Sequence, residues 1–174
     1  GEGYARGFEL FWRDNKSIKN AEYWISYSFL DTERNYRDFP YAAVPDFASQ
    51  HNLSVVYKHF IPAIRSQISG TYTFASGRPY NDLNEQSFNA GKTPSFQDLG
   101  ASVSYLATQN LILYLSVNNV LGRDNIFGYE YGNEPNEYGQ YNSKPVKMPA
   151  KRFFIIGVFF TLSKEGTLNQ MKSL

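Results

Sequence analysis

The chain has 174 residues, a length typical of one domain, and its 17 basic and 16 acidic residues leave a formal net charge of +1. This balance provides no field that would favour nucleic acid or an acidic substrate as a partner. The absence of cysteine excludes disulfides and thiolate metal sites. The longest apolar run, 153–160, is interrupted by Gly157 and falls far short of the roughly 18 residues that a transmembrane helix needs.

Seven segments in which apolar and polar residues alternate predict β-strands. In chain order they are Gly3–Arg13, Ala21–Leu30, Asn52–Phe60, Ile64–Ala75, Gln97–Leu106, Leu111–Val120 and Arg152–Ser163. The fourth is the clearest, because a complete polar row faces away from its apolar residues: Arg65, Gln67, Ser69, Thr71 and Thr73. Such a row indicates a water-facing side of a sheet and not a packed core.

The connections between these segments alternate in length. The short ones are 14–20, 61–63 and 107–110, and the long ones are 31–51, 76–96 and 121–151. Outer-membrane barrels show this asymmetry because tight periplasmic turns alternate with extended external loops. The sequence therefore predicts an all-β, antiparallel transmembrane β-barrel segment in which about seven long strands span the bilayer.

Aromatic residues support the same interpretation, since 14 Tyr, 14 Phe and 2 Trp make up 17% of the chain. Tyr and Trp at strand ends form the interfacial girdles of membrane barrels. Bacterial single-chain barrels have an even number of strands, so a seven-stranded segment that starts at Gly1 is expected to be part of a larger barrel.

Three segments resemble TonB-dependent receptors. Residues 111–129, in which Asn119-Val120-Leu121 follows an alternating strand and precedes Phe127 and Tyr129, are similar to the penultimate strand of that family. Arg152–Leu162, with its basic start and central glycine, resembles the final strand, and Ser76–Tyr80 resembles the start of an external loop. The resemblance implies that residues 1–163 are the last seven strands of a barrel of about 22 strands in the cell outer membrane.

The resemblance also implies energised uptake of a large ligand such as a siderophore, a cobalamin-like cofactor or a glycan. The partners would be outer-membrane lipid, the rest of the barrel with its plug, and the TonB system, reached through the N-terminal part of such receptors. Two departures from the family pattern are Leu162, where an aromatic residue is typical, and the continuation as residues 164–174. A periplasmic tail of this kind suggests the glycan-importing subclass, whose members have a surface lipoprotein partner.

Six residues of the long connections are candidates for ligand contact: Tyr80, Asn81, Tyr129, Tyr131, Tyr138 and Tyr141. Tyrosine offers a flat face for a sugar ring and a hydroxyl for hydrogen bonds. The alternative is that these tyrosines pack the loops together or form the external girdle. The polar row of the fourth strand would face the lumen, where contact with the plug is favoured over lining of the transport path.

Neither a metal site nor an enzymatic activity is predicted. His51 and His59 lie about 27 Å apart if one strand carries both, and no local signature brings Ser, His and Asp together. Two other folds remain as alternatives. A soluble β-sandwich that binds carbohydrate would need shorter strands and no wet face, and a complete eight-stranded barrel would need a further strand at Ile126–Tyr131.

Overall fold

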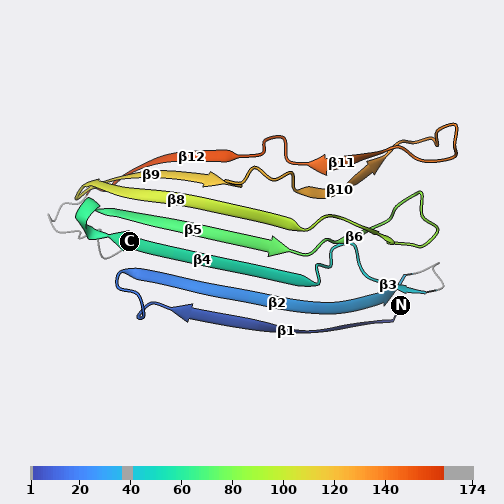
Figure 1. The fold of residues 1–174 in the computed structure, drawn as a ribbon, viewed down its shortest axis with the longest axis horizontal. Helices are drawn as coiled ribbons and strands as arrows, with labels where there is room; N and C mark the ends of the chain where they lie inside the picture. Colours follow the sequence, from blue (N-terminus) through green and yellow to red (C-terminus); the bar gives the residue numbers. More distant parts are fainter. Residues whose placement is uncertain (1, 37–40, 163–174) are drawn as a thin grey trace.

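The computed structural model describes residues 2–36 and 41–162. Its main element is an antiparallel sheet in which the long strands lie side by side in the order of the chain (Figure 1). These strands are β1 (Gly3–Asp14), β2 (Ala21–Asn35), β4 (His51–Ile61), β5 (Ser66–Ala75), β8 (Phe96–Thr108), β9 (Leu111–Asn118) and β12 (Phe153–Phe160). The seven predicted strands are thus confirmed, although several of their ends differ.

The other strands are short and belong to the long connections. β3 (Ala42–Ala43) pairs with the end of β2, β6 (Pro79–Tyr80) pairs with β7 (Gly91–Lys92), and β10 (Ile126–Tyr131) pairs with β11 (Ser143–Lys147). The additional strand that a complete small barrel would need therefore exists, but it forms a separate hairpin outside the main sheet. This pairing argues against a compact eight-stranded barrel.

The beginning of β5 differs from the prediction. Pro62–Ile64 form a 3-10 turn, and Arg65 follows in the left-handed conformation with φ 48°. Proline favours such a turn because its φ is fixed and it lacks an N–H group for the strand ladder. The strand consequently starts at Ser66, so that Ile64 and Arg65 are not part of it. In the described part of the chain, no helix has the length and apolar character that a membrane span requires.

β2 extends beyond the prediction, to Asn35, because both of its neighbours continue with it. Gly3 of β1 pairs with Arg34, and Ala43 of β3 pairs with the same residue from the other side. β9 ends at Asn118 because the next residue, Asn119, has a φ of 50°, which a strand cannot accommodate.

The register places the two kinds of side chain on opposite faces of the sheet. One continuous row across four strands is apolar, and the row displaced by one residue is polar. The apolar row is Ile25, Val55, Tyr72 and Leu99, and the polar row is Ser26, Ser54, Thr73 and Asp98. A sheet with one apolar and one wet face has the character of a barrel wall that separates lipid from an aqueous interior.

This sheet has no hydrophobic core. Among the described residues the buried apolar ones are Ala21, Ala43, Pro45, Ala48 and Leu106, whereas Ile156 of β12 is 81% exposed. A β-sandwich would cover its apolar face with a second sheet, but Figure 1 shows the long strands as one layer. The structure therefore argues against the soluble sandwich.

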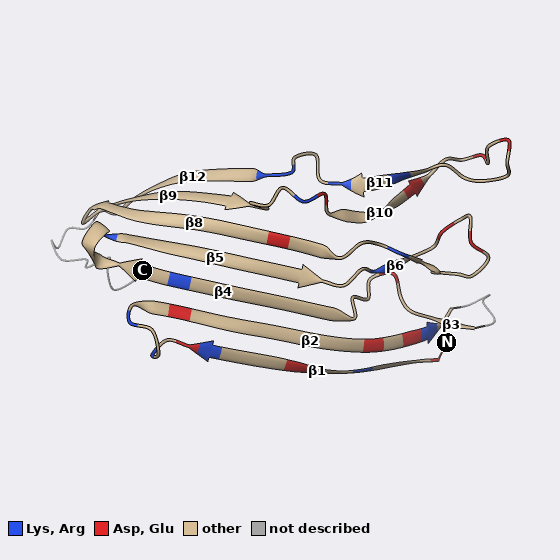
Figure 2. Ribbon diagram, viewed as in Figure 1, with Lys and Arg blue, Asp and Glu red and all other residues tan. Residues whose placement is uncertain are grey.

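Charged residues are concentrated toward the strand ends and in the connections, and the middle of the sheet carries few of them (Figure 2). The sheet is also open. In the part that the structure describes, β1 pairs with β2 alone and β12 with β9 alone, so each presents a free edge.

Candidate ligand-binding rim

The three long connections leave the same end of the sheet (Figure 1). They are named here L1 (residues 36 and 41–50), L2 (residues 76–95) and L3 (residues 119–152). L2 contacts both of the others. The Tyr41 hydroxyl of L1 accepts a hydrogen bond from the Phe88 N–H at 2.8 Å, and the Asn89 side-chain amide donates to the Val44 carbonyl at 3.0 Å. We call the surface formed by L1, L2 and L3 the loop rim.

A glycine allows L2 to fold back on itself. A side chain at Gly77 would clash with the Thr93 carbonyl, so only glycine permits this approach. Directly after it, the Arg78 N–H donates to the Thr93 hydroxyl at 2.9 Å, and the Thr93 N–H donates to the Arg78 carbonyl at 2.9 Å. The loop start that resembles the family is thereby fixed against Thr93, the residue that follows β7.

Tyr80 packs between L2 and L3. Its ring lies 4.8 Å from the ring of Tyr129, measured between centroids, at an interplanar angle of 35°. It also lies so close to Gly91 that a Cβ there would run into the ring atoms. These contacts agree with the alternative that the tyrosines pack the loops together.

Next to this pair, the Asp82 carboxylate accepts hydrogen bonds from two phenol groups, those of Tyr80 and Tyr131. The Tyr80 hydroxyl donates to the Asp82 carboxylate at 3.5 Å, and the Asn84 N–H donates to it at 2.9 Å. The hydrogen bond from Asn84 lowers the pKa of Asp82, with a further contribution from the Tyr131 hydroxyl. Burial and the hydrogen bond to Asp82 raise the pKa of Tyr131, so both phenols are neutral donors at physiological pH.

The root of L3 is built around two buried asparagines. The Asn119 side-chain amide donates to the Arg123 carbonyl at 2.8 Å and to the Lys151 carbonyl at 2.6 Å, and its oxygen accepts from the Arg123 N–H at 3.1 Å. Asn125 bonds both backbone groups of Gln97 on β8. The Asn119-Val120-Leu121 motif thus joins the two ends of L3, and Asn125 attaches the loop to the sheet.

The candidate ligand residues do not form one site. Tyr80, Tyr129 and Tyr131 come together, and Asn81 is exposed beside them. Tyr141 is bound to L2 through its backbone, and Tyr138 is 86% exposed in the connection between β10 and β11.

The polar row of β5 is only partly regular. Gln67, Ser69, Thr71 and Thr73 alternate along the strand and pair with Ser104, Ser102, Gly100 and Asp98 of β8. Arg65 precedes the strand, in the turn, and its carbonyl accepts a hydrogen bond from Leu106. The Gln67 side-chain oxygen is buried and has no hydrogen-bond partner among the described residues.

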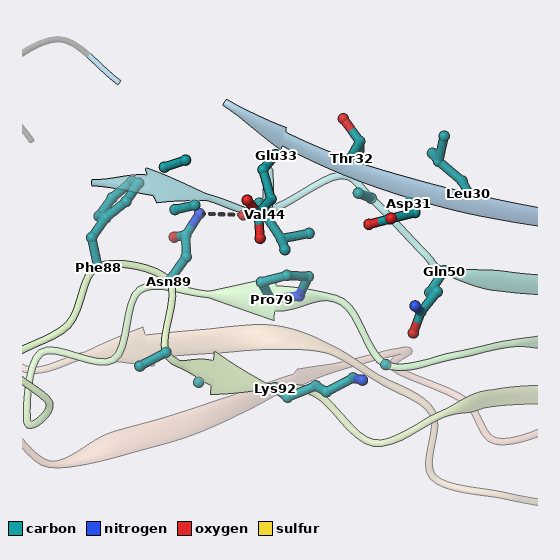
Figure 3. Close-up of a pocket in the computed structure, with 16 residues that line it drawn as sticks. Leu30, Asp31, Thr32, Glu33, Val44, Gln50, Pro79, Phe88, Asn89 and Lys92 are labelled. Atoms are coloured by element: carbon teal, nitrogen blue, oxygen red, sulfur yellow. Dashed lines mark hydrogen bonds between the residues drawn. The ribbon is translucent and has the colours of Figure 1, made fainter. Parts of the chain in front are cut away.

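A cavity of about 340 Å³ lies between L1, L2 and the end of β2 (Figure 3). The hydrogen bond from Asn89 to Val44 crosses one side of it, and Asp31, Glu33 and Lys92 are among the lining residues. The Asp31 carboxylate is already compensated, since the Arg6 guanidinium lies 2.7 Å from it.

A second cavity, of about 250 Å³, is formed where L1, L2 and L3 meet above β4, β5 and β8. We call it the rim cavity. Its walls include Phe47, Phe96 and Phe127, and Arg78 is its only charged lining residue in the part of the chain that the structure describes. Sequence reasoning missed this site, although Arg78 lies inside the Ser76–Tyr80 segment that resembles the family.

Both histidines have a tyrosine partner. The distance between His51 Nδ1 and the Tyr27 hydroxyl is 2.8 Å, and that between His59 Nδ1 and the Tyr57 hydroxyl is 2.9 Å. Within residues 2–36 and 41–162, no group of three or more His, Cys, Asp or Glu residues is placed to hold a metal ion.

Comparison with known proteins gives one family match. The family model described as TonB dependent receptor-like, beta-barrel matches residues 1–120. The matched region contains β1 to β9 together with L1 and L2, which is more than half of the chain. No curated protein matches the chain.

Proposed function

The chain belongs to the family of TonB-dependent receptor-like β-barrels, and from this premise we propose that it supplies barrel wall and three external loops to a receptor for energised uptake of a large ligand. The family is found in the cell outer membrane and acts in transport. The observation that supports the proposal best is the single sheet with one apolar and one polar face. In the proposed barrel the apolar face of the sheet points outward and contacts outer-membrane lipid, and the polar face points toward the lumen.

In the proposed barrel, residues 1–163 form the last strands of about 22, as in large outer-membrane transporters. The free edges of β1 and β12 would pair with other strands of the same barrel, because an unpaired edge is not tolerated in lipid. Residues 164–174, which lie outside the described residues, would form a periplasmic tail.

The proposed ligand is too large or too scarce for porins and is a siderophore, a cobalamin-like cofactor or a glycan. Its contacts would come from the loop rim, through Tyr80, Asn81, Tyr129, Tyr131, Tyr138 and Tyr141. For this chain we propose a transport role and no enzymatic activity.

The polar row is proposed to face the lumen and to contact the plug, through Arg65, Gln67, Ser69, Thr71 and Thr73. The alternation of Gln67, Ser69, Thr71 and Thr73 on one face of β5 supports such a contact, because polar side chains on the inner face of the wall can form hydrogen bonds with a plug. The TonB system would act through the N-terminal part of the receptor, and a surface lipoprotein would cover the rim in the glycan-importing subclass.

Single cysteines test whether the long loops lie outside the cell and the short turns in the periplasm, since the chain itself contains no cysteine. In the complete receptor, with any cysteine elsewhere replaced, Asn81→Cys and Gln109→Cys place a thiol on opposite ends of the sheet. A membrane-impermeant maleimide added to intact cells should label position 81 and should reach position 109 only after lysis. Labelling of position 109 in intact cells, with position 81 protected, would overturn the proposed orientation.

A further inference from the structure

We propose that the rim cavity binds a negatively charged group that is carried on a flat apolar ring. The inference rests on the proposed function, because it assumes that L1, L2 and L3 meet a ligand. It narrows the class of ligand to one with a carboxylate, phosphate or sulfate beside a ring. The argument uses the walls of the cavity, its charge and the polar groups of its floor.

The walls are aromatic and come from different parts of the chain. Phe96 begins β8, Phe127 lies on β10, and their ring centroids are 6.0 Å apart at an angle of 45°. Phe47 of L1 adds a third ring. Rings of this kind bury the apolar body of a small ligand and favour flat partners.

The charge of the cavity is positive. The Arg78 guanidinium lies 3.5 Å from the Phe127 carbonyl, measured from Nη2, so that it reaches from L2 to the wall contributed by L3. In the described ranges, Arg78 is not within ion-pair distance of a carboxylate.

The polar groups of the cavity floor form hydrogen bonds with one another. The Ser49 hydroxyl donates to the Ser76 carbonyl at 2.9 Å, and the Ser76 hydroxyl accepts from the His51 N–H at 3.0 Å. The Asn52 side-chain amide donates to the Ser49 carbonyl at 3.2 Å. These groups are bonded to each other and carry no charge, so the Arg78 guanidinium is the charged donor that the described lining offers to an anion.

The backbone of Arg78 is held in place, which makes its side chain a defined binding group. Two hydrogen bonds join its N–H and carbonyl to Thr93, which is buried. A planar guanidinium with several free donors binds carboxylates and phosphates through paired hydrogen bonds. A neighbouring cavity provides a contrast, because its lining combines the carboxylates of Asp31 and Glu33 with the ammonium of Lys92 and so carries no net positive charge.

The test is titration of three ring-bearing probes by saturation-transfer NMR, using the complete receptor in detergent and empty micelles as the blank. Phenyl phosphate and benzoate carry the anion, and phenyl β-glucoside is the neutral counterpart. We expect both anions to bind more tightly than the glucoside. Arg78→Gln should weaken anion binding by about tenfold, since one charge-assisted pair is removed.

Lys92→Gln is the matched control, because it removes a positive charge from L2 at the other cavity. It should leave anion binding within about twofold of the wild type. The ratio of phosphate to benzoate affinity then identifies the preferred anion. Equal binding of the glucoside and the anions, or equal losses in Arg78→Gln and Lys92→Gln, would overturn the proposal.

Arg78→Lys serves as a second variant should Arg78→Gln fail to assemble, as judged by heat-modified mobility on electrophoresis. Lysine keeps the charge and loses the planar fork, so anion binding should be reduced but should still exceed glucoside binding. If Arg78→Lys bound the anions no more tightly than the glucoside, the result would count against the site. The maleimide labelling needs no ligand, so a normal labelling pattern without anion binding would reject this inference alone.

Discussion

The side-chain amide of Asn84 forms two hydrogen bonds with the backbone of Tyr141, 57 positions later in the chain. Its nitrogen donates to the Tyr141 carbonyl at 3.0 Å, and the Tyr141 N–H donates to its oxygen at 2.7 Å. The amide therefore replaces a peptide group of a neighbouring strand. Through this contact, the outer part of L2 holds the outer part of L3.

Replacing Asn84 by alanine should loosen L3 without changing the barrel. The two lost hydrogen bonds have a net value of about 0.5 to 1.5 kcal/mol each. Hydrogen exchange of the Tyr141 amide should become faster, whereas the amides of β9 should be unaffected. Asn81→Ala is the control, because Asn81 is exposed in the same loop. Similar exchange at Tyr141 in both variants would show that the Asn84 contact does not order L3.

Replacing Asn119 should destabilise the root of L3 more strongly. Asn119→Ala removes three hydrogen bonds of a buried side chain and places alanine at a φ of 50°. We expect a loss of about 2 to 4 kcal/mol, read from urea unfolding of the complete receptor. Asn119→Gly relieves the backbone strain but not the lost bonds, so it should recover only a small part. Full recovery in the glycine variant would assign the effect to the backbone alone.

The two faces of the sheet should respond differently to charge. Leu113 lies on the apolar face, opposite Tyr105 and Val158, and Thr71 lies on the polar face, opposite Val56 and Gly100. Leu113→Arg should cost about 2 to 4 kcal/mol near the middle of the bilayer. Thr71→Arg should be much milder in the same unfolding experiment. Equal tolerance at both positions would refute the assignment of the lipid face.

Acidic pH should weaken the ion pair that holds the root of L3 together. The Asp124 carboxylate lies 2.9 Å from the Lys151 ammonium, and the hydrogen bond between them lowers the pKa of Asp124. A lowered folded-state pKa means that the stabilising contribution is present above the ordinary pKa of the carboxyl. It is lost as the pH falls through the lowered value. Proteolysis of L3 by an acid-stable protease should therefore increase in this range, and Asp124→Asn should remove the dependence.

The strands could be predicted because alternation is a local property. Ile25, Tyr27 and Phe29 identify the apolar face of β2 whatever their neighbours are, and the register then aligns matching faces across the sheet. The ends of the strands could not be predicted as well from the sequence. The conformation of Arg65 depends on the turn that precedes it, and the extension of β2 to Asn35 depends on pairing with β1 and β3.

The site was harder to predict because its contacts join distant loops. The cluster of Tyr80, Tyr129 and Tyr131 lies within the residues selected from the sequence, but no pattern indicates that Tyr80 would be enclosed by Gly91 and Tyr129. The rim cavity was missed for the same reason. Arg78 and Phe127 meet only when L2 and L3 are folded.

The order of the main sheet affects how the barrel assembles. Every long strand is bonded to the long strand that precedes it, with the pairing passing from β1 to β12 in the order of synthesis. Such a sheet can grow by adding one strand at a time. The longest stretch of chain that a step closes is L3, and the entropic cost of closing a loop rises only slowly with its length. In the proposed barrel β1 would pair with the strand that precedes it in sequence, and only the outer edge of β12 must find a partner that is remote in sequence. Completion of the ring, and not pairing within this segment, should therefore be the slow event of insertion into the membrane.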